Sequence, residues 1–112
     1  MLSDELRYQL LRTLERNPEM TQRQIAKELD LSLGKVNYCI KALLEKGLVI
    51  VKKMESKSES KPYSYKLTSK GVEEKSSTTV TLLQSKEREK EKLLRYIEEL
   101  KTELGNGFSK EL

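Results

Sequence analysis

The apolar positions of residues 21–51 follow two helical stripes separated by a short turn. In the first stripe, Ile25, Ala26 and Leu29 fall on one face of a helix that opens at Thr21. In the second, apolar residues recur at the i, i+3, i+4, i+7 spacing of a buried helix face. This spacing predicts helices over residues 21–29 and 32–46, the second burying Val36, Cys39, Ile40, Leu43 and Leu44.

The residues between and after the two stripes predict how each helix ends. Leu31 supplies the apolar plug of a tight turn, and Ser32 is a preferred N-cap for the second helix. Asp30 stands where many helix-turn-helix turns carry glycine, and Asp tolerates left-handed backbone better than most residues. Gly47 stands where a left-handed C-cap costs least. The stretch therefore reads as a helix-turn-helix that runs into a strand.

The flanking sequence completes a small domain. Residues 4–16 predict a first helix that ends before Pro18 because the residue preceding proline is pushed out of the α region. Its apolar face needs a cover, which the next two helices provide. This face consists of Leu6, Leu10, Leu11 and Leu14.

Two short segments rich in Val, Ile and Tyr follow, over residues 48–54 and 63–67, and predict a β-hairpin. Three helices followed by a hairpin is the order of a winged helix, with residues 54–62 as the wing. The fold class is therefore mainly α with a small β-hairpin, and residues 1–68 form a winged helix-turn-helix domain.

From Thr68 or Ser69 the pattern predicts one long helix over residues 69–104, followed by a flexible tail over residues 105–112 that begins with glycine. Apolar residues in this helix follow the alternating four- and three-residue spacing of a coiled-coil seam, although Lys86 and Lys90 interrupt it. We expect the helix to form a homodimer; the alternative is an amphipathic helix folded back on its own core. The spacing leaves parallel and antiparallel arrangements open. The seam residues are Leu83, Leu93, Ile97, Leu100 and Leu104.

Composition limits what the chain can be. With 112 residues, 36% of them charged and 36% hydrophobic, the chain can bury only a small core. The longest apolar run covers residues 48–51, and the N-terminus lacks the basic start of a secretory signal, so we expect a soluble cytoplasmic protein without membrane contact. Cys39, the single cysteine, fits a reducing compartment. It reads as a small buried hydrophobe, with a redox-sensing thiol as the alternative.

The positive charge lies in the middle of the chain. Residues 21–71 carry eleven basic and five acidic groups, whereas residues 1–20 and 72–112 each have a net charge of −1. A basic centre suits phosphate binding, because Lys and Arg that neutralise phosphates release condensed counterions. The alternative is a solvated basic surface.

The residue types argue against catalysis. The chain has no histidine and one cysteine, and it shows neither a carboxylate cluster at metal-ligand spacing nor a glycine-rich phosphate loop. We therefore expect no enzyme activity, metal or cofactor.

The outward face of residues 32–46 suits a DNA groove. Asn37 is the leading base reader, because its amide can donate to N7 and accept from N6 of adenine. Tyr38 can contact a base edge or a phosphate, whereas Lys35 and Lys41 position the helix. Residues at helix starts suit phosphates, though Thr21 and Ser32 are also plain caps. The predicted DNA contacts are Thr21, Gln22, Ser32, Leu33, Gly34, Lys35, Asn37, Tyr38 and Lys41, with Lys53, Lys57 and Lys61 in the wing.

Residues 21–51, together with the sequence LTSKG at residues 67–71, resemble the MarR-type winged-helix regulators, whose wing returns into an LTxxG element. The short members associated with exopolysaccharide gene clusters are the most similar. The resemblance implies a dimeric bacterial or archaeal transcriptional regulator, with residues 32–46 as recognition helix. The wing lacks the Asp-x-Arg element usual in larger MarR proteins, so wing contacts are expected from lysines. The extra helices that build an effector pocket in those proteins have no counterpart, so the sequence assigns no effector.

Two function classes follow. The first is sequence-specific binding of double-stranded DNA by a dimer, as a transcriptional regulator. The second is a winged helix used as a protein-interaction module, with the long helix docking a partner protein. The salt dependence of nucleic-acid binding separates the two.

Overall fold

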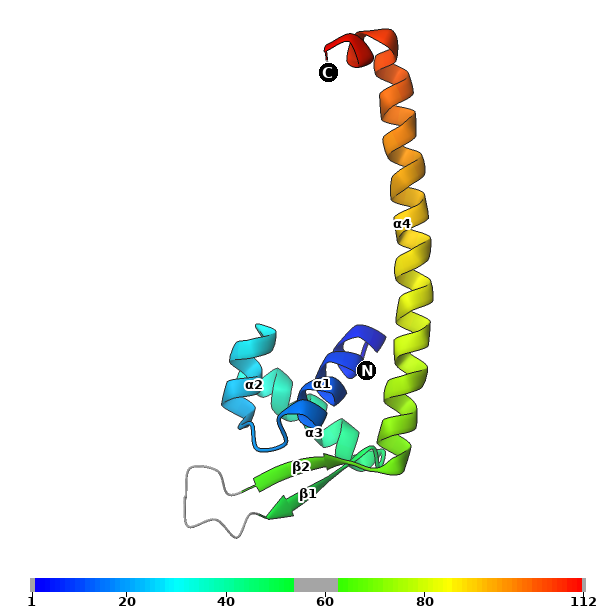
Figure 1. Cartoon of the computed structure of the whole chain (residues 1–112). Helices are drawn as coiled ribbons and strands as arrows, with labels where there is room; N and C mark the ends of the chain where they lie inside the picture. The colour runs from blue at the N-terminus through cyan, green and yellow to red at the C-terminus, as the bar shows by residue number, and fades with distance from the viewer. Residues whose placement is uncertain (1, 54–62, 112) are drawn as a thin grey trace. The chain divides into compact units, whose positions relative to one another are not determined.

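The computed structural model describes residues 2–53 and 63–111, with side chains for residues 2–52 and 64–105. Three helices, a two-stranded hairpin and a fourth helix follow one another along the chain (Figure 1). This confirms the predicted fold class. The elements are α1 (Asp4–Arg16), α2 (Gln22–Leu29), α3 (Leu33–Glu45), β1 (Val49–Lys53), β2 (Tyr63–Leu67) and α4 (Ser69–Glu111).

The chain divides into two compact units, Met1–Val80 and Thr81–Leu112. The first unit holds α1 to α3, the hairpin and the first turns of α4; the second holds the rest of α4. The division thus lies inside α4, beyond the limit expected at residue 68. Within the first unit, Arg7 and Glu15 of α1 form ion pairs with Glu74 and Lys75 of α4.

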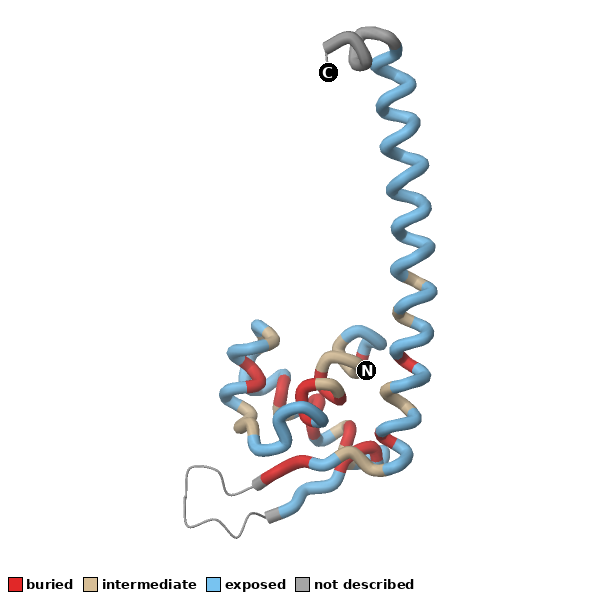
Figure 2. The backbone as a smooth tube through the Cα atoms, in the orientation of Figure 1, coloured by how far each residue is buried: buried red, intermediate tan, exposed pale blue. Residues whose placement is uncertain are grey.

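The core of the first unit is built from the predicted stripes (Figure 2). The inward-facing residues of α1, α2 and α3 are almost fully buried, while Leu6, Leu29 and Leu44 pack at the edge of the core. Burial of this apolar surface is the main force that holds three short helices together. The most deeply buried side chains are Leu10, Leu11, Leu14, Ile25, Val36, Cys39, Ile40, Leu43 and Val49.

Both helices of the helix-turn-helix end in the same hydrogen-bonded motif. Asp30 adopts left-handed backbone (φ 56°), and the Leu31 N–H donates to the Ala26 carbonyl at 2.8 Å. Gly47 is also left-handed (φ 70°), and the Leu48 N–H donates to the Leu43 carbonyl at 3.0 Å. These are Schellman caps, in which the residue after the left-handed position turns back onto the helix. The predicted turn and C-cap are confirmed.

The hairpin pairs β1 and β2 antiparallel, with Val51 opposite Tyr65. On its other side, β2 is joined to the connection between α1 and α2, because the Tyr65 N–H donates to the Pro18 carbonyl at 2.9 Å. This hydrogen bond fixes the middle of β2, and with it the base of the hairpin, to the helical part of the domain.

The sequence LTSKG joins the hairpin to α4. The Thr68 hydroxyl donates to the Gly47 carbonyl at 2.6 Å and accepts the Gly71 N–H at 3.0 Å, so Thr68 caps α4 and holds the end of α3. Gly71 lies against the Leu48 carbonyl, where a Cβ atom would approach the oxygen to 1.9 Å. Only glycine fits this position without movement of the backbone.

Helix α4 is regular up to Gly105, where the backbone leaves the helical region (φ 60°, ψ −146°). The glycine therefore interrupts the helix where the sequence predicted. Helical structure then resumes and continues to Glu111, in the segment for which the sequence predicted a flexible tail. Within α4, Gly105 is the residue with non-helical backbone angles.

Replacement of Gly71 by alanine tests the close approach of α4 to Leu48, the residue before β1. We expect Gly71→Ala to lower the free energy of unfolding by about 2 to 3 kcal/mol, because the backbone carbonyl of Leu48 must move. The matched control is Gly34→Ala in α3, where a Cβ meets no atom within 4 Å. The control should gain roughly 0.5 to 1 kcal/mol from helix propensity. Denaturant unfolding of both variants measures the difference; equal stabilities would contradict the close approach.

Candidate nucleic-acid interface

The first half of α3 presents an outer face that the core does not use. Leu33 and Tyr38 are 41% and 56% exposed, and Lys35 and Lys41 are also exposed. The Lys35 ammonium lies over the Tyr38 ring, 5.9 Å from its centroid. A cation and an aromatic ring thus share one solvent-facing surface at the start of the helix, and the exposed Leu33 lies at its first residue. This combination suits phosphates and base edges together.

Thr21 and Ser32 both act as N-caps. The Thr21 hydroxyl oxygen accepts the Gln24 N–H at 3.1 Å, and the Gln24 side chain accepts the Thr21 N–H at 2.9 Å, which completes a capping box. The Ser32 oxygen accepts the Lys35 N–H at 3.0 Å. The capping role of both residues is therefore present in the free chain, and phosphate contact by their hydroxyl groups stays a prediction.

Asn37, the predicted base reader, lies at the edge of the outer face and is half-buried. Its amide nitrogen donates to Gln22 Oε1 at 3.1 Å. Gln22 in turn donates through Nε2 to the Tyr65 hydroxyl at 3.1 Å. We call this the Asn37–Gln22–Tyr65 chain. It links α3, the first residue of α2 and strand β2, which are far apart in the sequence.

Tyr65 is the functional candidate that sequence reasoning missed. Alternation along residues 63–67 predicted a strand, and a tyrosine in a strand is ordinary packing. Its ring is indeed buried, with 9% of the residue exposed, but its hydroxyl reaches Gln22. No local pattern carries this information, because the three partners come together only when the hairpin packs on the helices.

Residues 3–50 match the protein family described as winged helix-turn-helix DNA-binding. The fold is a winged helix-turn-helix. Similar solved structures include Staphylococcus aureus MepR in complex with DNA, with a TM-score of 0.61 and 18% identity over 89% of this chain and 79% of that chain. Another is a Mycobacterium tuberculosis MarR family protein in complex with p-aminosalicylic acid, at TM-score 0.60 and 18% identity, covering 84% and 75%.

A third similar structure is Staphylococcus aureus MarR in complex with salicylate and kanamycin, at TM-score 0.56 and 18% identity over 84% of this chain and 70% of that chain. No curated protein matches the chain. At these identities the likeness is one of fold, and it extends beyond the winged helix into α4.

The wing of this winged helix is described only at its base. Lys52 is exposed on β1, and Lys53 ends that strand. Lys57 and Lys61 lie outside the described residues, so the predicted wing contacts remain predictions.

The seam residues of α4 form a series of exposed apolar side chains in the second unit. Their exposed fractions range from 37% for Ile97 to 60% for Leu104. Within the described residues of Thr81–Leu112, only Leu82 and Ser85 are even partly buried. The predicted seam is Leu83, Leu93, Ile97, Leu100 and Leu104.

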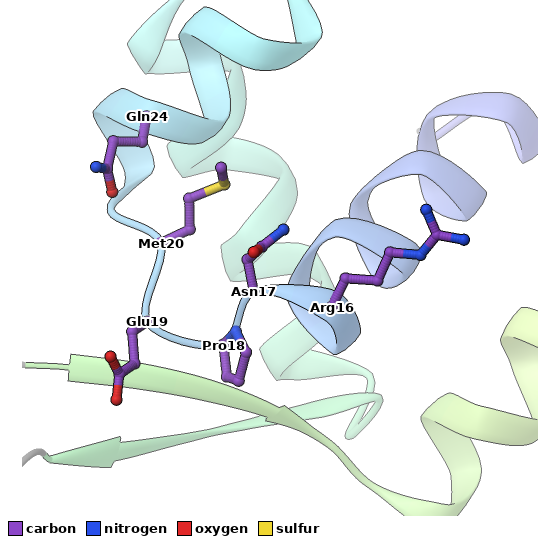
Figure 3. Close-up of a pocket in the computed structure, with 6 residues that line it drawn as sticks. All are labelled: Arg16, Asn17, Pro18, Glu19, Met20 and Gln24. Atoms are coloured by element: carbon purple, nitrogen blue, oxygen red, sulfur yellow. The ribbon is translucent and has the colours of Figure 1, made fainter.

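A hollow of about 470 Å³ lies where α1 connects to α2 (Figure 3). Gln24 and Arg16 stand on opposite sides, with Met20 and Asn17 between them. None of the residues that line the hollow belongs to α3, and they bring together no nucleophile with a base. Across the described residues there is no group of three potential metal-ligating side chains, and no helix there is long and apolar enough to cross a membrane.

Cys39 lies on the inner face of α3 with no exposed surface. Burial raises the pKa of its thiol, and the positive charge of Lys35 offsets this only in part. Because the thiolate is the reactive form, the structure favours Cys39 as a core residue over Cys39 as a redox sensor.

Thiol labelling tests the role of Cys39. We expect a thiol reagent to modify Cys39 in the folded chain about 10³-fold or more slowly than in denaturant, because exposing the core costs about 5 kcal/mol or more. The rate is followed by absorbance or mass spectrometry. Labelling of the folded chain at the rate of the denatured one would show a reactive thiol instead.

Proposed function

We propose that the chain is a cytoplasmic MarR-type transcriptional regulator that binds double-stranded DNA as a homodimer. The observation that carries the proposal is the exposed outer face of α3, where Leu33, Lys35, Tyr38 and Lys41 stand clear of the core of a winged helix-turn-helix. The likeness to a MepR–DNA complex supports the same function. Among MarR-type regulators, we place it with the short members associated with exopolysaccharide gene clusters, on the sequence of α3.

In this proposal α3 enters the major groove with its N-terminal half. Asn37 reads an adenine, while Lys35 and Lys41 contact flanking phosphates. The space beside Gly34 is open on the protein side, since a Cβ atom added there would meet no atom within 4 Å, so the DNA backbone can approach α3 closely at this residue. Lysines of the wing bind the phosphates beside the groove.

The second half of α4 pairs with that of a second chain. Exposed leucine and isoleucine at coiled-coil spacing favour association, since burial of apolar surface stabilises the dimer by roughly 25 cal/mol per Å². A two-fold symmetric dimer presents two α3 helices. We therefore infer a palindromic operator with half-sites about one helical turn apart, roughly 34 to 36 Å.

Two alanine variants test the reading face. Lys35→Ala should weaken binding to all DNA sequences and reduce the slope of log K against log salt by about 1, whereas Asn37→Ala should cost about 1 to 3 kcal/mol on the selected operator alone. The matched control is Lys92→Ala, an exposed lysine in the second unit of the chain and outside the seam. Fluorescence anisotropy over a salt series measures all three.

The same experiment separates the two function classes. Wild-type binding that does not weaken steeply with salt would favour the protein-interaction module over the DNA-binding regulator. If binding is salt-dependent but neither variant differs from Lys92→Ala, then the assigned face of α3 is wrong.

A lysine in the seam tests the dimer. Leu100→Lys should convert the dimer to a monomer, because it places a charge in the buried interface, and light scattering should report half the mass. The matched control is Thr102→Lys, which adds the same charge on the opposite side of α4 from the seam. Loss of the dimer in both variants, or a monomeric wild type, would exclude the seam.

A further inference from the structure

The Asn37–Gln22–Tyr65 chain is made of groups that can reverse their roles. A primary amide carries an acceptor oxygen and a donor nitrogen, and a tyrosine hydroxyl both donates and accepts. In the structure, Asn37 donates to Gln22 and Gln22 donates to Tyr65. The reverse direction, with Tyr65 donating to Gln22 and Gln22 donating to Asn37, would satisfy the same three groups.

The direction of the chain decides what Asn37 offers to DNA. In the observed direction one N–H of Asn37 is used by Gln22, which leaves the second N–H and the Oδ1 oxygen. Among the described residues, that oxygen accepts no hydrogen bond. One donor beside one acceptor is the pattern that matches N7 and N6 of adenine. In the reverse direction the oxygen faces Gln22 and accepts from it, and the amide turns its two N–H donors toward the DNA, which match the N7 and O6 acceptors of guanine.

Gln22 and Tyr65, the two partners that support Asn37, are both held by the fold. Gln22 is the first residue of α2, directly after the capping box of Thr21 and Gln24. The Tyr65 ring is buried, and its backbone is held between the Pro18 carbonyl and Val51 of β1. The hydroxyl of Tyr65 therefore has a fixed place relative to α3. Gln22 is hydrogen-bonded both to this hydroxyl and to Asn37, so it connects the two residues.

We propose that Gln22 and Tyr65 are positioning residues that set the amide orientation of Asn37 and thereby its preference for adenine over guanine. The inference rests on the proposed function, because it concerns how the same α3 face reads a base. It assigns to strand β2 a part in base selection that requires no contact between Tyr65 and DNA.

Four variants test the inference on the operator selected by the full-length wild type. At the base pair where Asn37→Ala loses its preference, wild type should favour adenine over guanine by about 5- to 150-fold, the range for a bidentate contact. Gln22→Glu can only accept, from Asn37 and from Tyr65, so it should keep the preference. Gln22→Lys can only donate, so it should bring the preference below wild type and toward guanine. Tyr65→Phe removes only the hydroxyl and should reduce the preference toward onefold.

Two controls separate base preference from charge and packing. Gln24→Glu places the same negative charge in the first turn of α2 and can still accept the Thr21 N–H. It should weaken binding to all sequences about as much as Gln22→Glu does. Tyr8→Phe removes a hydroxyl on α1, outside the chain, and should behave as wild type in base preference.

Competition binding on the adenine and guanine versions of the operator gives the outcome. An unchanged adenine preference in both Tyr65→Phe and Gln22→Lys, or its loss in Gln22→Glu, overturns the inference while salt-dependent DNA binding by wild type still supports the proposed function. Absence of DNA binding by wild type overturns the proposed function itself. Should Tyr65→Phe prove unstable in thermal unfolding, the opposite effects of Gln22→Glu and Gln22→Lys decide the question.

Discussion

The contact between Gly71 and the Leu48 carbonyl is the constraint on which the rest of the winged helix depends. A Cβ atom at residue 71 would lie 1.9 Å from that oxygen, so no side chain fits there. The first turn of α4 therefore packs directly against the backbone of Leu48, just before β1. Thr68 strengthens the contact, because its hydroxyl donates to the end of α3 while accepting an N–H from α4. Leu48 itself is the residue that turns back onto α3 in the Schellman cap. One small set of backbone groups therefore fixes α3, the hairpin and the start of α4 relative to one another.

This arrangement divides the two faces of α3. The inner face is buried in the core, since Val36, Cys39 and Ile40 have almost no exposed surface. The outer face keeps large side chains exposed to water, since Leu33 and Tyr38 are 41% and 56% exposed. Exposed apolar and aromatic residues beside lysines are more readily understood as a binding surface than as a structural one.

How far the sequence predicted this depends on the range of the interactions. Helical stripes and caps are local, so Ile25, Ile40, Thr21 and Ser32 were placed correctly. Asp30 stands where many helix-turn-helix turns carry glycine, and its backbone is left-handed as such a turn requires. The Asn37–Gln22–Tyr65 chain could not be predicted, because it joins residues up to 43 positions apart through the packing of the hairpin. The ion pairs between α1 and α4 are equally non-local, since they join residues 60 or more positions apart. The DNA contacts of Lys57 and Lys61 stay predictions, because both residues lie outside the described part of the chain.

The composition of the chain bears on how its reading face can be controlled. Base selection through Asn37 and Gln22 uses primary amides, which carry no ionisable proton, and the sequence contains no histidine to titrate near neutral pH. The fixed partner at the end of these hydrogen bonds is the Tyr65 hydroxyl, whose place follows from the packing of β2 against the connection after α1. A change that shifts β2 by a fraction of an ångström would alter the amide of Asn37 before it altered the helices, because the core holds the helices more firmly than two neutral hydrogen bonds hold the amide. Under the proposed roles of Asn37, Gln22 and Tyr65, the hairpin would act on sequence preference through the interior of the domain, independently of any contact between the wing and the DNA backbone.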